Sequence, residues 1–93
     1  MAAWTWRVEF HPAAVRDLRK LGSDAERRIL RYLRERIAGS NDPRLLGHAL
    51  TGDLKGLWRY RVGDYRLIAQ IEDDRLVVLV VALGHRREVY RNR

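Results

Sequence analysis

Hydrophobic and polar residues alternate at the start of the chain, where Trp4, Trp6, Val8 and Phe10 occupy every second position. A period of two is typical of a strand with one buried face. The sequence therefore predicts a first strand that ends before His11 and Pro12, a pair that interrupts the alternation.

The pattern then changes to the spacing of two helices. Pro12 suits the first turn of a helix, and apolar residues three apart continue to Gly22, which predicts a helix over 12–21. Ser23 followed by Glu26 is a capping-box pattern, and the apolar stripe behind it predicts a second helix up to Gly39. We interpret the opposite side of this helix as a solvated face that also attracts anions; it carries Arg27, Arg28, Arg31, Arg34, Glu35 and Arg36.

Turn-forming residues dominate positions 39–56, which we expect to be a connection with a short helix near 43–47. Three further strands are predicted after it, over 57–62, 65–71 and 75–83, with turns at 63–64 and 72–74. The last strand is apolar on both faces, so it should lie inside the sheet with the first strand as its second neighbour. Together these elements predict one α+β domain over residues 1–93: an antiparallel sheet of about four strands (β-α-α-β-β-β), an N-terminal helical hairpin on one face, and a short C-terminal helical segment.

A two-residue turn at Gly63-Asp64 would place Arg61 opposite Arg66 and would separate the two faces of the hairpin. One face carries residues that can pack under the helices: Trp58, Tyr60, Val62, Tyr65, Leu67, Ala69 and Ile71. The other face carries Arg59, Arg61, Arg66 and Gln70. Like charges opposite each other destabilise a sheet by a few tenths to about 1 kcal/mol, so these arginines indicate an anionic ligand. The alternative is an ordinary solvated sheet face.

A second two-residue turn, at Asp73-Asp74, would pair Tyr65 with Ala82 and bring the residues after Gly84 beside the arginines. Arg86 and Tyr90 would share one side of that segment if it is helical. Arginine stays protonated and can grip a phosphate, whereas surrounding cations favour the phenolate of Tyr90, which could take a proton from an attacking ribose 2′-hydroxyl. The chemistry predicted is metal-free RNA cleavage. Spacing alone supports equally a Tyr90 that only packs the C-terminal tail.

The charge of the chain limits the classes of molecule that it is expected to bind. The formal net charge is +7 and the pI is about 10.8, with 19 basic residues of which all but Lys20 and Lys55 are arginine. Nucleic acid, an acidic protein and a membrane surface would all be attracted to this charge, and the bidentate guanidinium favours nucleic acid.

The absence of cysteine excludes disulfides and thiolate metal sites and fits a cytoplasmic protein. The histidines lack metal-ligand spacing, and the longest apolar run is too short to span a membrane, so we expect no metal, no secretion signal and no membrane partner.

The order of these elements, with the sequences WRYRV at 58–62, DYRLI at 64–68 and GHRREVY at 84–90, resembles the RelE/ParE superfamily of bacterial toxins, on the RelE side. The resemblance implies the toxin of a type II toxin–antitoxin system: a ribosome-dependent endoribonuclease that cuts mRNA in the decoding site, needs no cofactor and is inhibited by a cognate RelB-like antitoxin. It implies that Arg59, Arg61, Arg66 and Arg86 grip the phosphate and that Tyr90 takes part in catalysis. We assign a supporting RNA-binding role to Lys55, His85 and Arg87.

Two other functions fit the same fold. A ParE-like toxin would inhibit DNA gyrase by contact and cut nothing. A catalytically degenerate basic module would only hold nucleic acid or antitoxin. The group of arginines with a nearby phenol favours the nuclease, because a gyrase inhibitor has no need of a phosphate grip.

Overall fold

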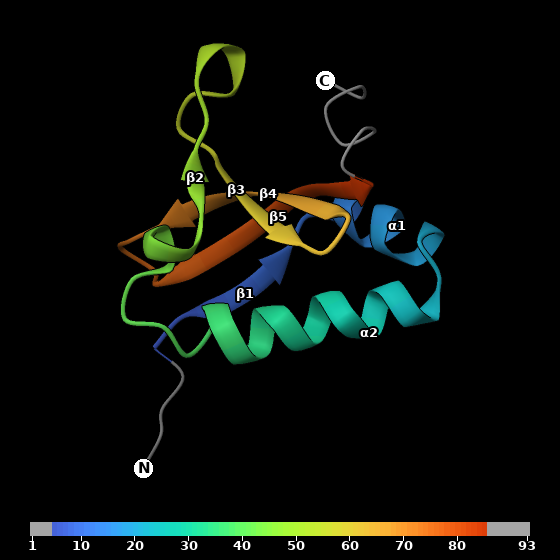
Figure 1. The fold of residues 1–93 in the computed structure, drawn as a ribbon. Coiled ribbons are helices and arrows are strands. Elements are labelled where there is room, and N and C mark those ends of the chain that lie inside the picture. The colour runs from blue at the N-terminus through green and yellow to red at the C-terminus, as the bar shows by residue number, and fades with distance from the viewer. Residues whose placement is uncertain (1–4, 86–93) are drawn as a thin grey trace.

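The computed structural model describes residues 5–85, in which one sheet is covered on one side by two helices (Figure 1). In chain order the elements are strand β1 (Arg7–Phe10), helices α1 (Pro12–Lys20) and α2 (Ser23–Tyr32), a π-helical turn (Leu33–Ile37), a 3₁₀ turn (Pro43–Leu46), strand β2 (His48–Ala49), a second 3₁₀ turn (Gly52–Leu54), and strands β3 (Trp58–Val62), β4 (Tyr65–Glu72) and β5 (Val77–His85). The predicted C-terminal helical segment, 84–93, lies almost wholly outside the described residues.

The sheet has the strand order β1-β5-β4-β3-β2, so β5 lies between β1 and β4 as its apolar faces predicted. The α+β class is confirmed, but the expected antiparallel sheet of about four strands is a five-stranded mixed sheet. β1 runs parallel to β5, and the short β2 pairs with β3. Alternation of apolar residues is the same for either strand direction, and a two-residue strand is too short to alternate, so neither feature could be predicted.

Local sequence explains the ends of the two helices. The ring Nδ1 of His11 accepts a hydrogen bond of 3.1 Å from the backbone N–H of Ala13, which caps α1 in front of Pro12. Gly22, with a φ of +94°, turns the chain into α2 and takes the N-cap position itself. The capping box predicted for Ser23 and Glu26 is therefore wrong, because Ser23 already lies in the first turn and caps nothing through its side chain.

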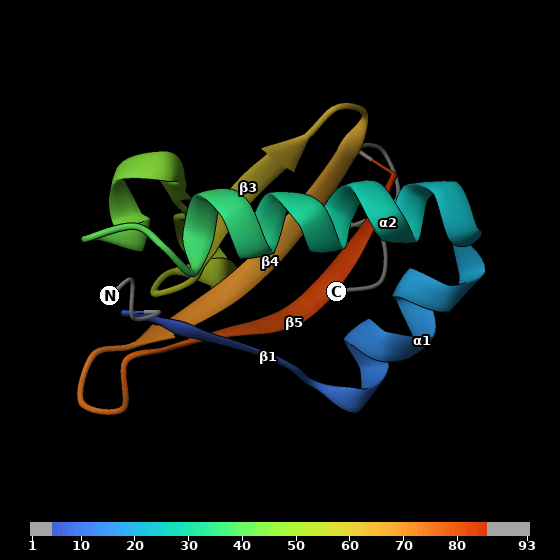
Figure 2. The same cartoon turned by 90° about the horizontal axis from the view of Figure 1, so that it is seen from below.

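The helices cover one face of the sheet, and the main core lies between the two layers (Figure 2). The face of β3 and β4 predicted to pack under the helices does so: Tyr60, Val62, Leu67 and Ala69 are buried in this core, and Trp58, Tyr65 and Ile71 pack against it. The opposite face, here called the outer face, is partly covered by the chain itself. Leu50 and Leu57 pack there against buried Ile68 and Ala82.

The turn at Gly63-Asp64 sets the predicted register of the β3–β4 hairpin, including Arg61 opposite Arg66 and Val62 opposite Tyr65. The β4–β5 register is wrong in our prediction. Its turn runs over residues 73–76, so that Glu72 faces Val77, and a bulge near Ile68 shifts the pairing again. As a result Tyr65 faces His85 instead of Ala82.

Two polar contacts hold the connection 39–56 against the sheet. The buried Tyr60 hydroxyl donates a hydrogen bond of 2.8 Å to the carbonyl of Pro43. The guanidinium of Arg44 meets the carboxylate of Asp73 through two N···O contacts, of 2.9 and 2.5 Å, and stacks over the ring of Trp58 at 5.9 Å. These contacts fix the position of β2 and of the loop beyond it.

Candidate functional site

Three arginines share the outer face at the end of the sheet near the β3–β4 turn. Arg59 and Arg61 lie two residues apart on β3, and Arg66 faces Arg61 from β4. The Arg66 guanidinium donates hydrogen bonds to the backbone carbonyls of Gly63, at 3.3 Å, and Tyr65, at 3.2 Å. The hairpin register predicted from the sequence thus brings the three side chains together as expected.

Charge is divided along the outer face. Glu9 and Glu72 lie toward the far end, where Glu9 approaches Arg7 at 3.3 Å and Arg75 at 3.5 Å, and Glu72 approaches Arg75 at 2.7 Å. Within residues 5–85, no carboxylate lies within 4.0 Å of the guanidinium of Arg59 or of Arg61. The end near the hairpin therefore concentrates positive charge on Arg59, Arg61 and Arg66, and such a surface attracts phosphate.

His48 was missed by the sequence reasoning, which treated it as a loop residue. It lies on β2 directly opposite Arg59, and residues so paired have Cβ atoms roughly 5 Å apart. Its side chain is exposed, so an imidazole is available for proton transfer beside the arginines. No sequence signal marked it, because β2 is only two residues long.

Lys55 lies on the loop that projects from the sheet on the side away from α2 (Figure 1). The loop is fastened by a backbone hydrogen bond of 3.0 Å from Leu50 to Leu57 and by the packing of both leucines on Ile68. The Lys55 side chain is exposed, so it borders the outer face without being part of the sheet.

The structure separates His85 from the arginines. Because Tyr65 faces His85 in the sheet, the two rings meet edge to face, with centroids 6.3 Å apart, on the side that packs toward the helices. The sequence had placed His85 beside Arg61 and Arg66; the four-residue turn and the bulge in β5 move it to the other face. Arg86, Arg87 and Tyr90 lie outside the described residues.

The site offers cations and hydrogen-bond donors. Over the described range 5–85, no group of three His, Cys, Asp or Glu side chains is arranged to hold a metal ion. In the same range no helix is both long enough and apolar enough to cross a membrane. What the outer face can do chemically is bind a phosphate diester through guanidinium groups and compensate negative charge that develops on it.

Comparisons with known proteins agree with this reading of the fold. Residues 8–90 match the family described as the ParE toxin of the type II toxin–antitoxin system parDE. The chain is 35% identical over 88 residues to the toxin RelG of Mycobacterium tuberculosis, covering 92% of this chain and 97% of that toxin. It is 32% identical over 87 residues to the mRNA interferase toxin RelE of Escherichia coli, covering 89% and 87%.

The fold also matches a solved toxin–antitoxin complex. In the RelBE2 complex of Mycobacterium tuberculosis, one chain is similar with a TM-score of 0.81 and 28% identity, over 88% of this chain and 92% of that chain. The family match spans nearly the whole sheet and both helices, and the relatives carry RelE-type names. This chain therefore belongs to the RelE/ParE superfamily of toxins of type II toxin–antitoxin systems.

Proposed function

We propose that this chain is a RelE-like mRNA interferase: a ribosome-dependent, metal-free endoribonuclease that cuts mRNA in the decoding site. The observation that carries the proposal is the pair Arg59 and Arg61, which have no carboxylate partner in the described part of the chain and lie beside Arg66. A fold gains nothing from opposed like charges, whereas a phosphate ligand uses them. The name of the Escherichia coli relative, an mRNA interferase toxin, supports the same activity.

The reaction is an internal transfer within RNA. The ribose 2′-oxygen forms a bond to the adjacent phosphorus, the bond from phosphorus to the 5′-oxygen breaks, and the products are a 2′,3′-cyclic phosphate and a 5′-hydroxyl. Arg59, Arg61 and Arg66 hold the phosphate and compensate the charge of the transition state. The family resemblance implies that Arg86 also grips the phosphate and that Tyr90 takes part in catalysis. In this proposal Tyr90 takes the proton of the 2′-hydroxyl, and the leaving 5′-oxygen, stabilised by Arg86, takes up a proton from water.

Lys55 and Arg87 would hold flanking RNA. His85 has a weaker claim to such a role, because its ring lies against Tyr65 on the other face of the sheet. His48 has a stronger one, because it is a titratable side chain directly opposite Arg59. We propose it as a second candidate for proton transfer at this site.

Two partners follow from this proposal. The ribosome and its mRNA place the activity in the cytoplasm. A cognate RelB-like antitoxin neutralises the exposed positive charge; the solved complex of the similar Mycobacterium tuberculosis toxin supports such a partner. An acidic antitoxin is attracted by the formal charge of +7.

The test is cleavage in a reconstituted translation system. Purified toxin should cut mRNA within translated codons, only on ribosomes, and should leave cyclic phosphate and 5′-hydroxyl ends in the presence of a chelator. Tyr90→Phe and Arg59→Gln should each slow cleavage by about 10²-fold or more, the usual effect of losing a base or a charge-stabilising donor. His48→Gln tests the second proton-transfer candidate. Unchanged rates in both Tyr90→Phe and Arg59→Gln would remove the mechanism.

Inhibition of DNA gyrase is the second candidate function, because the matching family is described by its ParE toxin. The same preparation separates the two. Gyrase-dependent breaks in plasmid DNA with intact mRNA would favour the ParE-like activity, and codon-specific RNA ends with intact DNA would favour the nuclease.

A further inference from the structure

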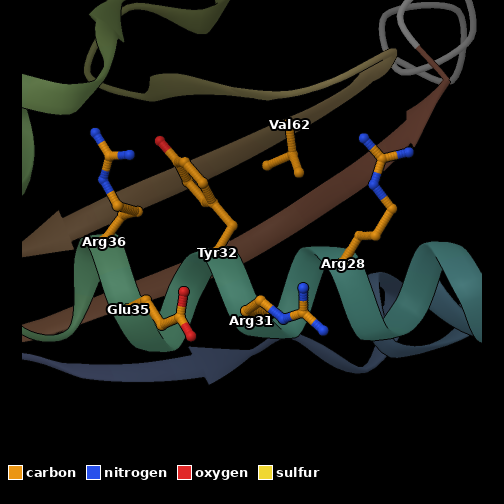
Figure 3. A pocket seen from close by; sticks show the side chains of 6 residues that line it. All are labelled: Arg28, Arg31, Tyr32, Glu35, Arg36 and Val62. Atoms are coloured by element: carbon orange, nitrogen blue, oxygen red, sulfur yellow. The ribbon is translucent and has the colours of Figure 1, made fainter.

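A second positively charged site lies on the helix side of the β3–β4 hairpin. A pocket of about 270 Å³ opens between α2 and the end of β3. It is lined by Arg28, Arg31, Tyr32, Glu35, Arg36 and Val62 (Figure 3). This pocket and the outer-face arginines lie on opposite sides of the sheet.

The lining side chains form an ordered row. Arg28 and Tyr32 on α2 and Arg36 on the π-helical turn that continues it are four residues apart and point toward β3, so that a phenol lies between two guanidiniums (Figure 3). Half of the eight residues from Arg28 to Arg36 lie in the π-helical turn, so the two arginines are at most about 12 Å apart along the axis. Burial raises the pKa of the Tyr32 hydroxyl, which therefore stays protonated and can donate a hydrogen bond to an anion.

Within the described residues, no carboxylate lies within 4.0 Å of Arg28, Arg31 or Arg36, although Glu35 lines the pocket. On the same helix, by contrast, Arg27 is paired with Asp24 at 2.5 Å. The pocket is thus the part of α2 and of the π-helical turn after it where positive charge gathers in a concavity.

The pocket is continuous with the outer-face arginines around the turn. Arg66 reaches the Gly63 carbonyl from the outer face, at 3.3 Å. From the helix face, the guanidinium of Arg28 lies so close to Gly63 that a Cβ there would be 2.8 Å from its Nη2. Two arginines on opposite faces of the sheet therefore lie next to the same residue. Positive charge thus continues around the hairpin tip from one face to the other, and the exposed Asp64 lies at this tip.

We propose that this pocket binds backbone phosphates of the same RNA strand that the outer face holds, a few nucleotides away from the scissile link. The inference rests on the proposed function, because it takes RNA as the ligand of the outer face. Guanidinium forks bind phosphate in two places, and a strand crossing the hairpin tip meets Arg28 first and Arg36 at most about 12 Å further on. An acidic peptide would find the same charges, but continuity with the outer-face arginines favours RNA.

The test measures binding of fluorescein-labelled 2′-O-methyl oligouridylates of 4 and 12 nucleotides to the full chain by fluorescence anisotropy, as a function of salt. Methylation blocks the 2′-oxygen, so the strands cannot be cut. The variant is Arg28→Gln with Arg36→Gln. The matched control is Arg19→Gln with Arg34→Gln, whose arginines are exposed and do not line the pocket; each pair lowers the formal charge by two, from +7 to +5.

The pocket variant should weaken binding of the 12-mer by about 25-fold at 0.1 M salt relative to the control. Each lost phosphate contact lowers the slope of log K against log salt by ~0.7 for a single strand, so two lost contacts lower it by about 1.4. At 0.1 M salt this change in slope corresponds to a factor of about 25 in the binding constant. The 4-mer, too short to cover both arginines from the outer face, should be affected much less. Circular dichroism of both variants checks that α2 is intact.

Equal binding of the 12-mer by the pocket variant and the control would overturn the inference. A second result would also overturn it: the pocket variant binds a labelled 12-residue polyglutamate peptide more weakly than the control does but binds RNA equally well. That result would mean that the pocket binds carboxylates. Cleavage in the translation system is read separately with the same variants. If the unmodified chain does not cleave mRNA, the proposed nuclease function is wrong. If it does cleave mRNA but the two double variants bind the 12-mer equally well, only the inference about the pocket is wrong.

Discussion

Replacing Arg61 with glutamine should make the protein more stable and less active at the same time. Arg61 faces Arg66 directly across the β3–β4 pair, and its side chain is exposed. Two unit charges about 7 Å apart in a medium close to water repel by about 0.6 kcal/mol, which agrees with the few tenths to about 1 kcal/mol known for like charges in cross-strand pairs. Glutamine removes the charge and keeps most of the stem.

The assay compares urea unfolding with cleavage on ribosomes. A gain of about 0.6 kcal/mol raises the melting temperature of a domain of this size by roughly 2–5 °C. The gain should largely disappear in 1 M salt, where the screening length falls to about 3 Å. Cleavage should fall by about 10²-fold, because one charge-stabilising group has been removed.

Arg16→Gln is the control. Arg16 is exposed on α1 and belongs to no ion pair among residues 5–85, so the same loss of charge there should leave stability within about 0.5 kcal/mol and leave cleavage unchanged. Two results would refute the reasoning. A less stable Arg61→Gln protein would mean that Arg61 supports the fold, and a stabilised variant with full activity would mean that it holds no phosphate.

Three further predictions concern the connection that carries β2. Tyr60→Phe should lower the free energy of unfolding by about 1–3 kcal/mol in urea titrations, because it leaves the Pro43 carbonyl without its buried donor; an unchanged midpoint would contradict this. Gly47→Ala should cost about 1–3 kcal/mol in the same assay, since its Cβ would lie 2.9 Å from a ring carbon of Tyr60, and wild-type stability would show that the ring moves freely. The Arg44 guanidinium holds the pKa of Asp73 below its usual 3.8, so the carboxylate contributes stability above that pH and loses it as pH falls through the lower folded value. Melting temperatures of Asp73→Asn should therefore fall below wild type near neutral pH and converge with it in acid; a constant difference would refute the assignment.

The sequence predicted the β3–β4 hairpin well because a two-residue turn determines register. Gly63 takes a φ of +59°, the conformation such a turn needs, and every pairing from Val62 with Tyr65 to Arg59 with Ile68 follows from it. The same register explains why the sequence alone groups the three outer-face arginines.

The prediction of the β4–β5 turn was wrong, because no local sequence signal determines its length. Leu76 begins an apolar run, which predicts a strand, but it adopts a φ of +53°, its backbone N–H donates a hydrogen bond of 3.3 Å to the Asp73 carbonyl, and the residue is 46% exposed. A leucine in the left-handed region gives no local signal, because tertiary pairing imposes that conformation. His85 was misplaced as a direct result, and His48 was missed because β2 exists only through its pairing with β3.

The parallel pairing of β1 with β5 has a consequence for synthesis of the chain. Among residues 5–85, β1 pairs only with β5, and the residues it pairs with, Val77–Val80, are made about 70 positions later. Closing so long a loop is slow, and a nascent chain emerges at only about 5–20 residues per second. The first strand of each new molecule therefore waits, without its partner, for several seconds while the rest is translated. Until β5 has left the ribosomal tunnel, the sheet that displays the outer-face arginines cannot be completed.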